Sequence, residues 1–453
     1  MLNSLQHARL RWRRTLIASA GLLLVTRPIL NSLGAQQSPV TVGLAGAGGA
    51  LPGFTGLVSN PALLALPGMP RVSISLPAID AGLGLAPVGF TAFTPFSGEL
   101  IPASVRTTWL DQIRAAGGGS MDASLGVRAL GVQIGAFALV GGTTAGAQAL
   151  LPPEAAQLLL FGNAGRTGAL EDIAVSGGTA RAWVVSSIGL SHGRRLPIRP
   201  FGGALAVGAT ANMLIGHALA DLAHTDADIG GTTGTIAAHG SVLTWGDTLA
   251  ANSKGMSLDV AAAWTRGRLT FGATMSNVMN TLRFSEKNAF ARERDITATS
   301  DSSLTTSNDG ALYLNGTAND MFGDDVRAQA ADVSRNARFR PALHFASRYA
   351  LRPSWDLLAD VSLQPDPSTA LTSGPRRAFA TATEFRGLPV VTLRAGLAAQ
   401  QGSEGTRLAF SGGFGLRVFA LRIDAGATQQ KGPGAETLRV AFGTGLTFGG
   451  VGR

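Results

Sequence analysis

Arginine and carboxylate residues recur on one face of the alternating segments in the last third of the sequence. The residues that share this parity are Arg348, Arg394, Arg417, Arg422 and Arg439 together with Asp356, Asp360, Glu384 and Asp424. A guanidinium donates two parallel hydrogen bonds to a carboxylate, so we expect these residues to pair in the interior. Two hypotheses stay open. In the first, the arginine–carboxylate pairs only fill the interior. In the second, the anionic head group of an amphiphilic ligand is bound by Arg348, Arg394, Arg417 and Arg439.

Two further patterns resemble chemical sites on first inspection. Gly189-Leu190-Ser191-His192-Gly193 matches the Gly-x-Ser-x-Gly motif of hydrolases, which needs a helix directly after the serine. Pro197 and Pro200 follow and cannot lie inside such a helix, so we interpret the motif as a strand end and turn. The acidic stretches His224–Asp228 and Gly323–Asp325 lack the spacing of a calcium loop and are interpreted as solvated loops. We predict no catalytic residue, no metal ligand, no cofactor and no enzymatic activity.

The composition is unusual for a soluble protein. The chain has 453 residues with 60 glycines, no cysteine and only 14% charged residues. The absence of cysteine excludes disulfides, thiolate metal sites and cysteine nucleophiles. The net charge of +9 owes much to five arginines within the first 35 residues, and no Lys/Arg-rich run follows. Nucleic acid is therefore not an expected partner.

The N-terminus has the layout of a secretory signal peptide. A basic stretch from Arg9 to Arg14 precedes an uncharged apolar run from Thr15 to Val25, and Leu33-Gly34-Ala35 offers a cleavage site. The apolar run is about half of the ~20 residues that a membrane-spanning helix needs. We therefore predict that residues 1–35 are a cleaved signal peptide and that the protein is exported.

Period-two alternation of apolar residues dominates the rest of the chain. In the last predicted strand, for example, Leu438, Val440 and Phe442 alternate with Arg439 and Ala441. Runs of about ten such residues match the strands of outer-membrane barrels. A soluble β-sandwich is the alternative, but its water-exposed face usually carries Lys and Glu. This chain has only three lysines, and its second face is mostly Gly, Ala, Ser and Thr.

Four segments interrupt the alternation. Residues 102–116 and 152–161 begin at prolines and end before glycines, which predicts two short helical inserts. The low-hydrophobicity segments from Asp221 to Gly255 and from Ser285 to Arg338 are predicted to be large outward loops.

The residues after the signal peptide carry a family resemblance. The small-residue run Gly43 to Ala50 followed by Asn60-Pro61-Ala62 resembles the N-terminal signature of the FadL-like superfamily of outer-membrane proteins, which includes fatty-acid transporters and PorV-type secretion barrels. This resemblance implies an all-β fold, an antiparallel transmembrane β-barrel of about 14 strands whose lumen is plugged by the N-terminal segment. The implied division is 1–35 signal peptide, 36–68 plug with the motif Asn60, Pro61 and Ala62, and 69–453 barrel.

The combined expectation is an outer-membrane barrel that transports hydrophobic or amphipathic small molecules passively. The alternative is a non-conducting barrel that acts as a scaffold or secretion shuttle for protein partners. The expected partners are outer-membrane lipid and lipopolysaccharide, the barrel assembly machinery and a hydrophobic small-molecule ligand. One feature departs from the usual pattern, because the chain ends Phe448-Gly449-Gly450-Val451-Gly452-Arg453 rather than on an aromatic residue.

Overall fold

The computed structural model describes residues 38–53, 59–162, 165–230, 235–245, 253–299, 312–317, 323–364, 371, 377–402, 405–432 and 435–448. Its main feature is a closed antiparallel barrel of 14 strands. In order around the wall, these are β1 (Val72–Ala86), β2 (Gly119–Ile134), β3 (Phe137–Leu151), β5 (Thr179–Arg195), β6 (Ala204–Gly230), β8 (Ser253–Arg266), β9 (Leu269–Asn280), β12 (Ala342–Arg352), β13 (Trp355–Leu363), β14 (Arg377–Phe385), β15 (Val391–Gly402), β16 (Gly405–Val418), β17 (Leu421–Lys431) and β18 (Glu436–Phe448). The predicted fold class is confirmed.

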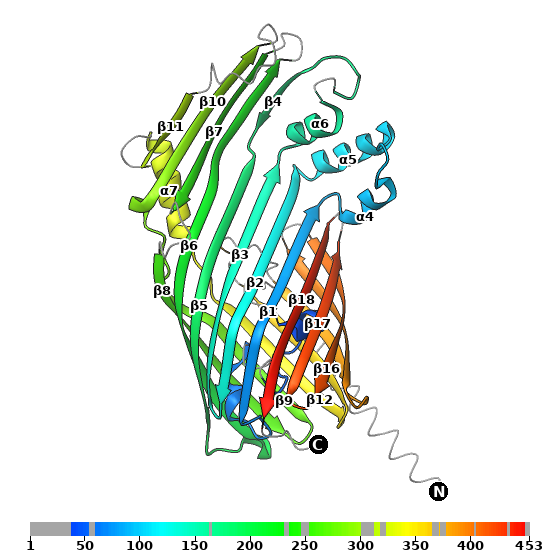
Figure 1. Cartoon of the computed structure of the whole chain (residues 1–453), viewed down its shortest axis with the longest axis vertical. Coiled ribbons are helices and arrows are strands. Elements are labelled where there is room, and N and C mark those ends of the chain that lie inside the picture. The colour runs from blue at the N-terminus through cyan, green and yellow to red at the C-terminus, as the bar shows by residue number, and fades with distance from the viewer. Residues whose placement is uncertain are drawn as a thin grey trace.

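The last strand closes the barrel by pairing with the first (Figure 1). Val72 of β1 lies opposite Phe448 of β18, and Leu85 lies opposite Glu436. A closed sheet has no free strand edge, which is the condition for placing β-structure in lipid. Among the described residues, no helix is long and apolar enough to span a membrane.

The two ends of the barrel differ in the length of their connections. At one end, six short turns join the strands, including the two-residue turn at 419–420 between β16 and β17. At the other end, the connections between β1 and β12 carry helices and additional strands (Figure 1). In outer-membrane barrels the short turns face the periplasm and the long connections face outward. We call the two ends the turn end and the loop end.

A five-strand extension stands on the loop end. The far part of β6 pairs with β4 (Asp172–Ser176) and β7 (Thr235–Trp245), β7 pairs with β10 (Ala289–Thr299), and β10 pairs with β11 (Leu312–Thr317). The prediction of loops over 221–255 and 285–338 was therefore wrong in its local structure. These strands stand beyond the barrel wall, so they lack the apolar outward alternation that marks the wall strands in the sequence.

Helices occupy the loop end and the lumen. α5 (Ala103–Ala115) and α6 (Pro153–Phe161) confirm the two predicted inserts, and α4 (Phe90–Phe93) precedes them. The sequence did not indicate α7 (Asp324–Asn336), which lies within a predicted loop. Its buried residues Val326, Ala330 and Val333 belong to an apolar cluster with Trp183 and Trp245 of β5 and β7.

The strand alternation separates an apolar outer face from a small-residue inner face. Phe410, Leu393 and Val440 point outward, with exposed fractions of 55%, 46% and 49%. Their neighbours Ala409 and Ala441 are buried inside. The predicted parity of these strands is therefore confirmed.

Candidate functional site

The N-terminal segment lies inside the barrel and forms two short helices. We call residues 38–53 and 59–69 the plug (Figure 1). α2 (Pro39–Val42) is capped by Ser38, whose side chain and that of Thr41 form a capping box. Leu44 and Leu51 pack on Leu358 of β13, so apolar contacts seat this first part of the plug against the wall.

The motif residues Asn60, Pro61 and Ala62 begin the second helix, η1 (Pro61–Ala65). The Asn60 Oδ1 atom accepts a hydrogen bond from the Ala62 N–H at 3.0 Å and so caps the helix. The Asn60 Nδ2 atom donates to the carbonyl oxygen of Ala262 in β8 at 3.1 Å. Asn60 therefore both starts the helix and ties it to the wall, which gives the sequence motif a physical role.

Glycines in the wall allow the plug backbone to approach the strands closely. A Cβ added at Gly208 of β6 would lie 2.5 Å from the Ala62 nitrogen. One added at Gly396 of β15 would lie 2.5 Å from the Leu44 carbonyl carbon. Side chains at these two positions would push the plug away from the wall, so part of the glycine content serves plug packing.

A wall carboxylate holds the glycine-rich turn of the plug. The Oδ2 atom of Asp360 in β13 accepts hydrogen bonds from the backbone N–H groups of Gly48 and Gly49, both at 2.9 Å. Gly48 has a φ of 144°, a conformation that L side chains rarely adopt. The same oxygen lies 3.2 Å from Nε2 of His344 in β12. Adjacent backbone N–H groups in such a turn can bind a carboxylate, and in this protein the side chain of Asp360 fills that position.

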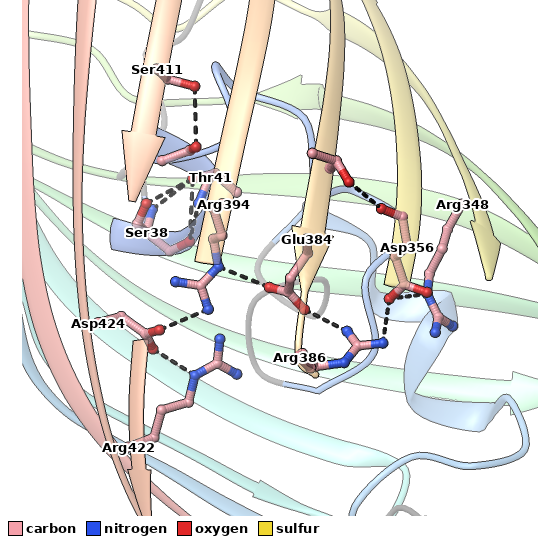
Figure 2. A network of polar contacts seen from close by, with 12 residues as sticks. Ser38, Thr41, Arg348, Asp356, Glu384, Arg386, Arg394, Ser411, Arg422 and Asp424 are labelled. Atoms are coloured by element: carbon pink, nitrogen blue, oxygen red, sulfur yellow. Dashed lines mark hydrogen bonds and ion pairs between the residues drawn. The ribbon is translucent and has the colours of Figure 1, made fainter. Parts of the chain in front are cut away.

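A chain of alternating charges runs along the wall beside α2 (Figure 2). Arg394 lies between two carboxylates, with Nε 2.8 Å from Glu384 and Nη2 2.9 Å from Asp424. Arg386 joins Glu384 to Asp356, and its Nη2 atom lies 2.7 Å from Asp356 Oδ2. Arg348 lies at one end of the chain, with its Nε atom 2.9 Å from Asp356 Oδ2, and Arg422 lies at the other end, with its Nε atom 2.7 Å from Asp424 Oδ2. We call these seven residues the ionic chain.

The predicted lumenal arginines have different surroundings. Arg348 and Arg394 belong to the ionic chain, which confirms the expected pairing with carboxylates. Arg439 of β18 lies elsewhere, 3.8 Å from Asp80 of β1, and donates to Ser124 Oγ at 3.2 Å. Arg417 is exposed near the turn end of β16 and lies outside the ionic chain. The role of these four residues in ligand binding remains a prediction.

The sequence does not indicate two parts of the site. Arg386 lies in the turn after β14, where strand parity does not apply. The hydrogen bond between Gly48 and Asp360 joins residues 312 positions apart, and neither residue type singles out the other. The only available signal was the glycine run itself, which indicates close backbone approach without naming the partner.

The other sequence motifs take structural positions. Ser191 lies within β5, and its hydroxyl group contacts the Thr210 hydroxyl group of β6 at 2.8 Å. Strand β5 continues to Arg195, and only the three-residue 3-10 helix η4 (Pro200–Gly202) lies between it and β6, so no helix directly follows the serine. Residues 224–228 are part of β6. No group of three metal-ligating side chains occurs in the part of the chain that the structure describes.

Comparison with known proteins supports the fold rather than a particular activity. No protein-family model matches the sequence, and no curated protein matches it. Among solved structures, the monoaromatic hydrocarbon channel CymD is similar with a TM-score of 0.51 and 11% identity, over 92% of this chain and 99% of that one. The fold implied by the FadL-like resemblance is therefore confirmed.

Two further matches have the same extent and a lower score. The toluene transporter TbuX of Ralstonia pickettii matches with a TM-score of 0.46 and 11% identity, over 91% of this chain and 98% of that one. A FadL homologue of Pseudomonas aeruginosa matches with a TM-score of 0.45 and 11% identity, over 93% of this chain and 100% of that one.

Proposed function

We propose that the protein is an outer-membrane barrel that gives hydrophobic or amphipathic small molecules a passive route across the membrane. The observation that carries this proposal is the combination of an apolar outer belt with a plug that lies in the lumen and is held there by non-covalent contacts with the wall. The fold shared with CymD, a monoaromatic hydrocarbon channel, supports the same class of solute.

The outer belt supports the membrane location. Leu190, Leu397 and Phe442, on β5, β15 and β18, have exposed fractions of 56%, 55% and 54%. A continuous apolar surface of this kind is unfavourable in water and favourable in lipid. Toward the loop end, one register line across β3, β5, β6 and β8 carries Thr143, Ser186, Ile215 and Lys254, so three of its four residues are polar.

The plug supports the passive route. Its two parts contact opposite sides of the wall, with α2 beside β16 to β18 and η1 beside β5, β6 and β8. Specific plug contacts include Asp360 with the glycine turn, Asn60 with β8, and the hydroxyl groups of Ser411 and Thr428 with the carbonyl oxygens of Gly43 and Val42. Non-covalent contacts of this kind can be exchanged when a solute displaces the plug.

Uptake into proteoliposomes tests the proposal. Full-length processed protein is reconstituted, and entry of toluene and of a long-chain fatty acid is compared with entry of glucose. We expect faster entry of the apolar solutes than in protein-free vesicles, with little effect on glucose. A correctly inserted barrel that passes none of them, with or without its plug, would favour the scaffold or shuttle alternative.

A further inference from the structure

Exposed arginines gather at the turn end of the barrel. We define the arginine ring as Arg195, Arg199, Arg266, Arg268, Arg352 and Arg417, all of which are exposed. They lie on or beside the turns that join β5 to β6, β8 to β9, β12 to β13 and β16 to β17. Arg71, directly before β1, is also exposed and extends the ring toward the barrel closure.

Within the described part of the chain, no exposed carboxylate at this end balances the positive charge of the ring. None of the residues in the six turns at this end is Asp or Glu. The nearby carboxylates Asp356, Glu384 and Asp424 are buried and already paired with arginines of the ionic chain. The ring therefore presents a positive surface that calls for an external anion.

Apolar side chains accompany the arginines. Phe201 and Phe419, at the tips of two turns, have exposed fractions of 84% and 95%, and Ile198 has 56%. The turn of Phe201 is held in place because Trp264 Nε1 donates to the Pro200 carbonyl oxygen at 2.9 Å. Aromatic residues next to cationic ones are typical of the boundary between the lipid tails and the head groups.

We infer that the arginine ring binds the phosphate groups of anionic phospholipids in the membrane leaflet at the turn end. Arginine suits this ligand because its planar guanidinium can hold two phosphate oxygens at once. The arrangement favours lipid over a protein partner. A soluble protein meets one side of the barrel, whereas the arginines occupy turns around its circumference, as the surrounding lipids do. The inference rests on the proposed membrane location.

The association of spin-labelled lipids with the reconstituted barrel tests this inference. The full-length processed protein is placed in phosphatidylcholine bilayers, and binding of labelled phosphatidylglycerol is compared with that of labelled phosphatidylcholine by electron spin resonance. We expect about a threefold preference for phosphatidylglycerol. High salt should reduce it, because the Debye length falls to about 3 Å at 1 M.

Two variants of equal charge change locate the effect. The combination Arg195→Gln, Arg199→Gln, Arg266→Gln and Arg352→Gln should reduce the preference to near parity. The combination Arg283→Gln, Lys287→Gln, Arg327→Gln and Arg335→Gln changes the loop end and should keep it. Both must still show the heat-modifiable band of a folded barrel.

Three outcomes would overturn the inference. They are an inserted wild-type barrel without lipid preference, an equal loss in both variants, and binding of soluble polyglutamate without lipid preference. Failure of the protein to insert into any bilayer would instead contradict the proposed function.

Discussion

Asp360 accepts a hydrogen bond from the backbone N–H of Gly48 at 2.9 Å, so a side chain of the barrel wall holds the turn of the N-terminal plug. The Gly49 N–H reaches the same oxygen, and Asp360 is only 3% exposed. A buried carboxylate that accepts two amide hydrogen bonds is a strong anchor, since hydrogen bonds to charged groups contribute about 1.5–3 kcal/mol each. If the plug closes the lumen, loss of this contact should open it.

The change Asp360→Ala should loosen the plug without dissolving the barrel. Its two amide partners lose their acceptor, so the plug should leave its closed position more often. We expect higher ion conductance in planar bilayers than for the wild type. Asp259→Ala serves as the control, because Asp259 is a lumenal carboxylate whose partners Asn212 and Asn277 are wall residues. Equal conductance of the two variants would contradict the anchoring role of Asp360.

Removal of residues 36–62 should have a larger effect in the same direction. The deletion removes α2, the glycine turn and the Asn60 cap, whereas the 14 wall strands keep their pairing. We expect leakage of small solutes from loaded proteoliposomes and an unchanged heat-modifiable band. A tight barrel after this deletion would mean that other elements close the lumen.

Gly396→Val should displace the plug through a steric conflict. The added side chain would meet the backbone of Leu44, which cannot move without breaking the contacts of the plug. Gly412→Val is the matched control on the next strand, because a Cβ there meets no atom within 4 Å and the position is exposed. We expect raised conductance for Gly396→Val alone, measured in the same planar bilayers.

A charged side chain placed in the apolar outer belt tests whether the outward residues of the wall strands face lipid. Phe410→Asp should impair insertion by about 2 kcal/mol, since a carboxylate near the membrane midplane loses its hydration. Gln400→Asp keeps a polar residue on the lumenal side and should insert almost normally. The folded fraction in a urea titration of the reconstituted protein measures both. Similar losses would show that Phe410 does not face lipid.

The wall could be predicted from the sequence because two environments act on every strand. On the proposed membrane location, lipid outside and a packed lumen inside impose a period of two, which is visible at Leu438, Val440 and Phe442. The extension on the loop end lacks that constraint, so β7 and β10 were predicted as loops. Asp360 was recognised as inward, but its contact with Gly48 depends on three-dimensional closure of the barrel, which one sequence does not reveal.

The last prediction separates a structural from a ligand-binding role of the arginines. Arg394→Ala removes the shared partner of Glu384 and Asp424, which keep Arg386 and Arg422. We therefore expect a loss of stability below the about 3–5 kcal/mol that breaking an isolated buried pair costs. Arg417→Ala removes an exposed side chain outside the ionic chain and should change the free energy of unfolding by less than about 0.5 kcal/mol. Urea unfolding in bilayers measures both free energies of unfolding.

Fatty-acid binding, compared with the binding of an alkane of similar length, then tests the ligand role of the arginine. If Arg417→Ala weakens binding of the fatty acid alone, Arg417 contacts the head group, whereas unchanged binding would contradict the predicted role of Arg417 as a ligand of the fatty-acid head group.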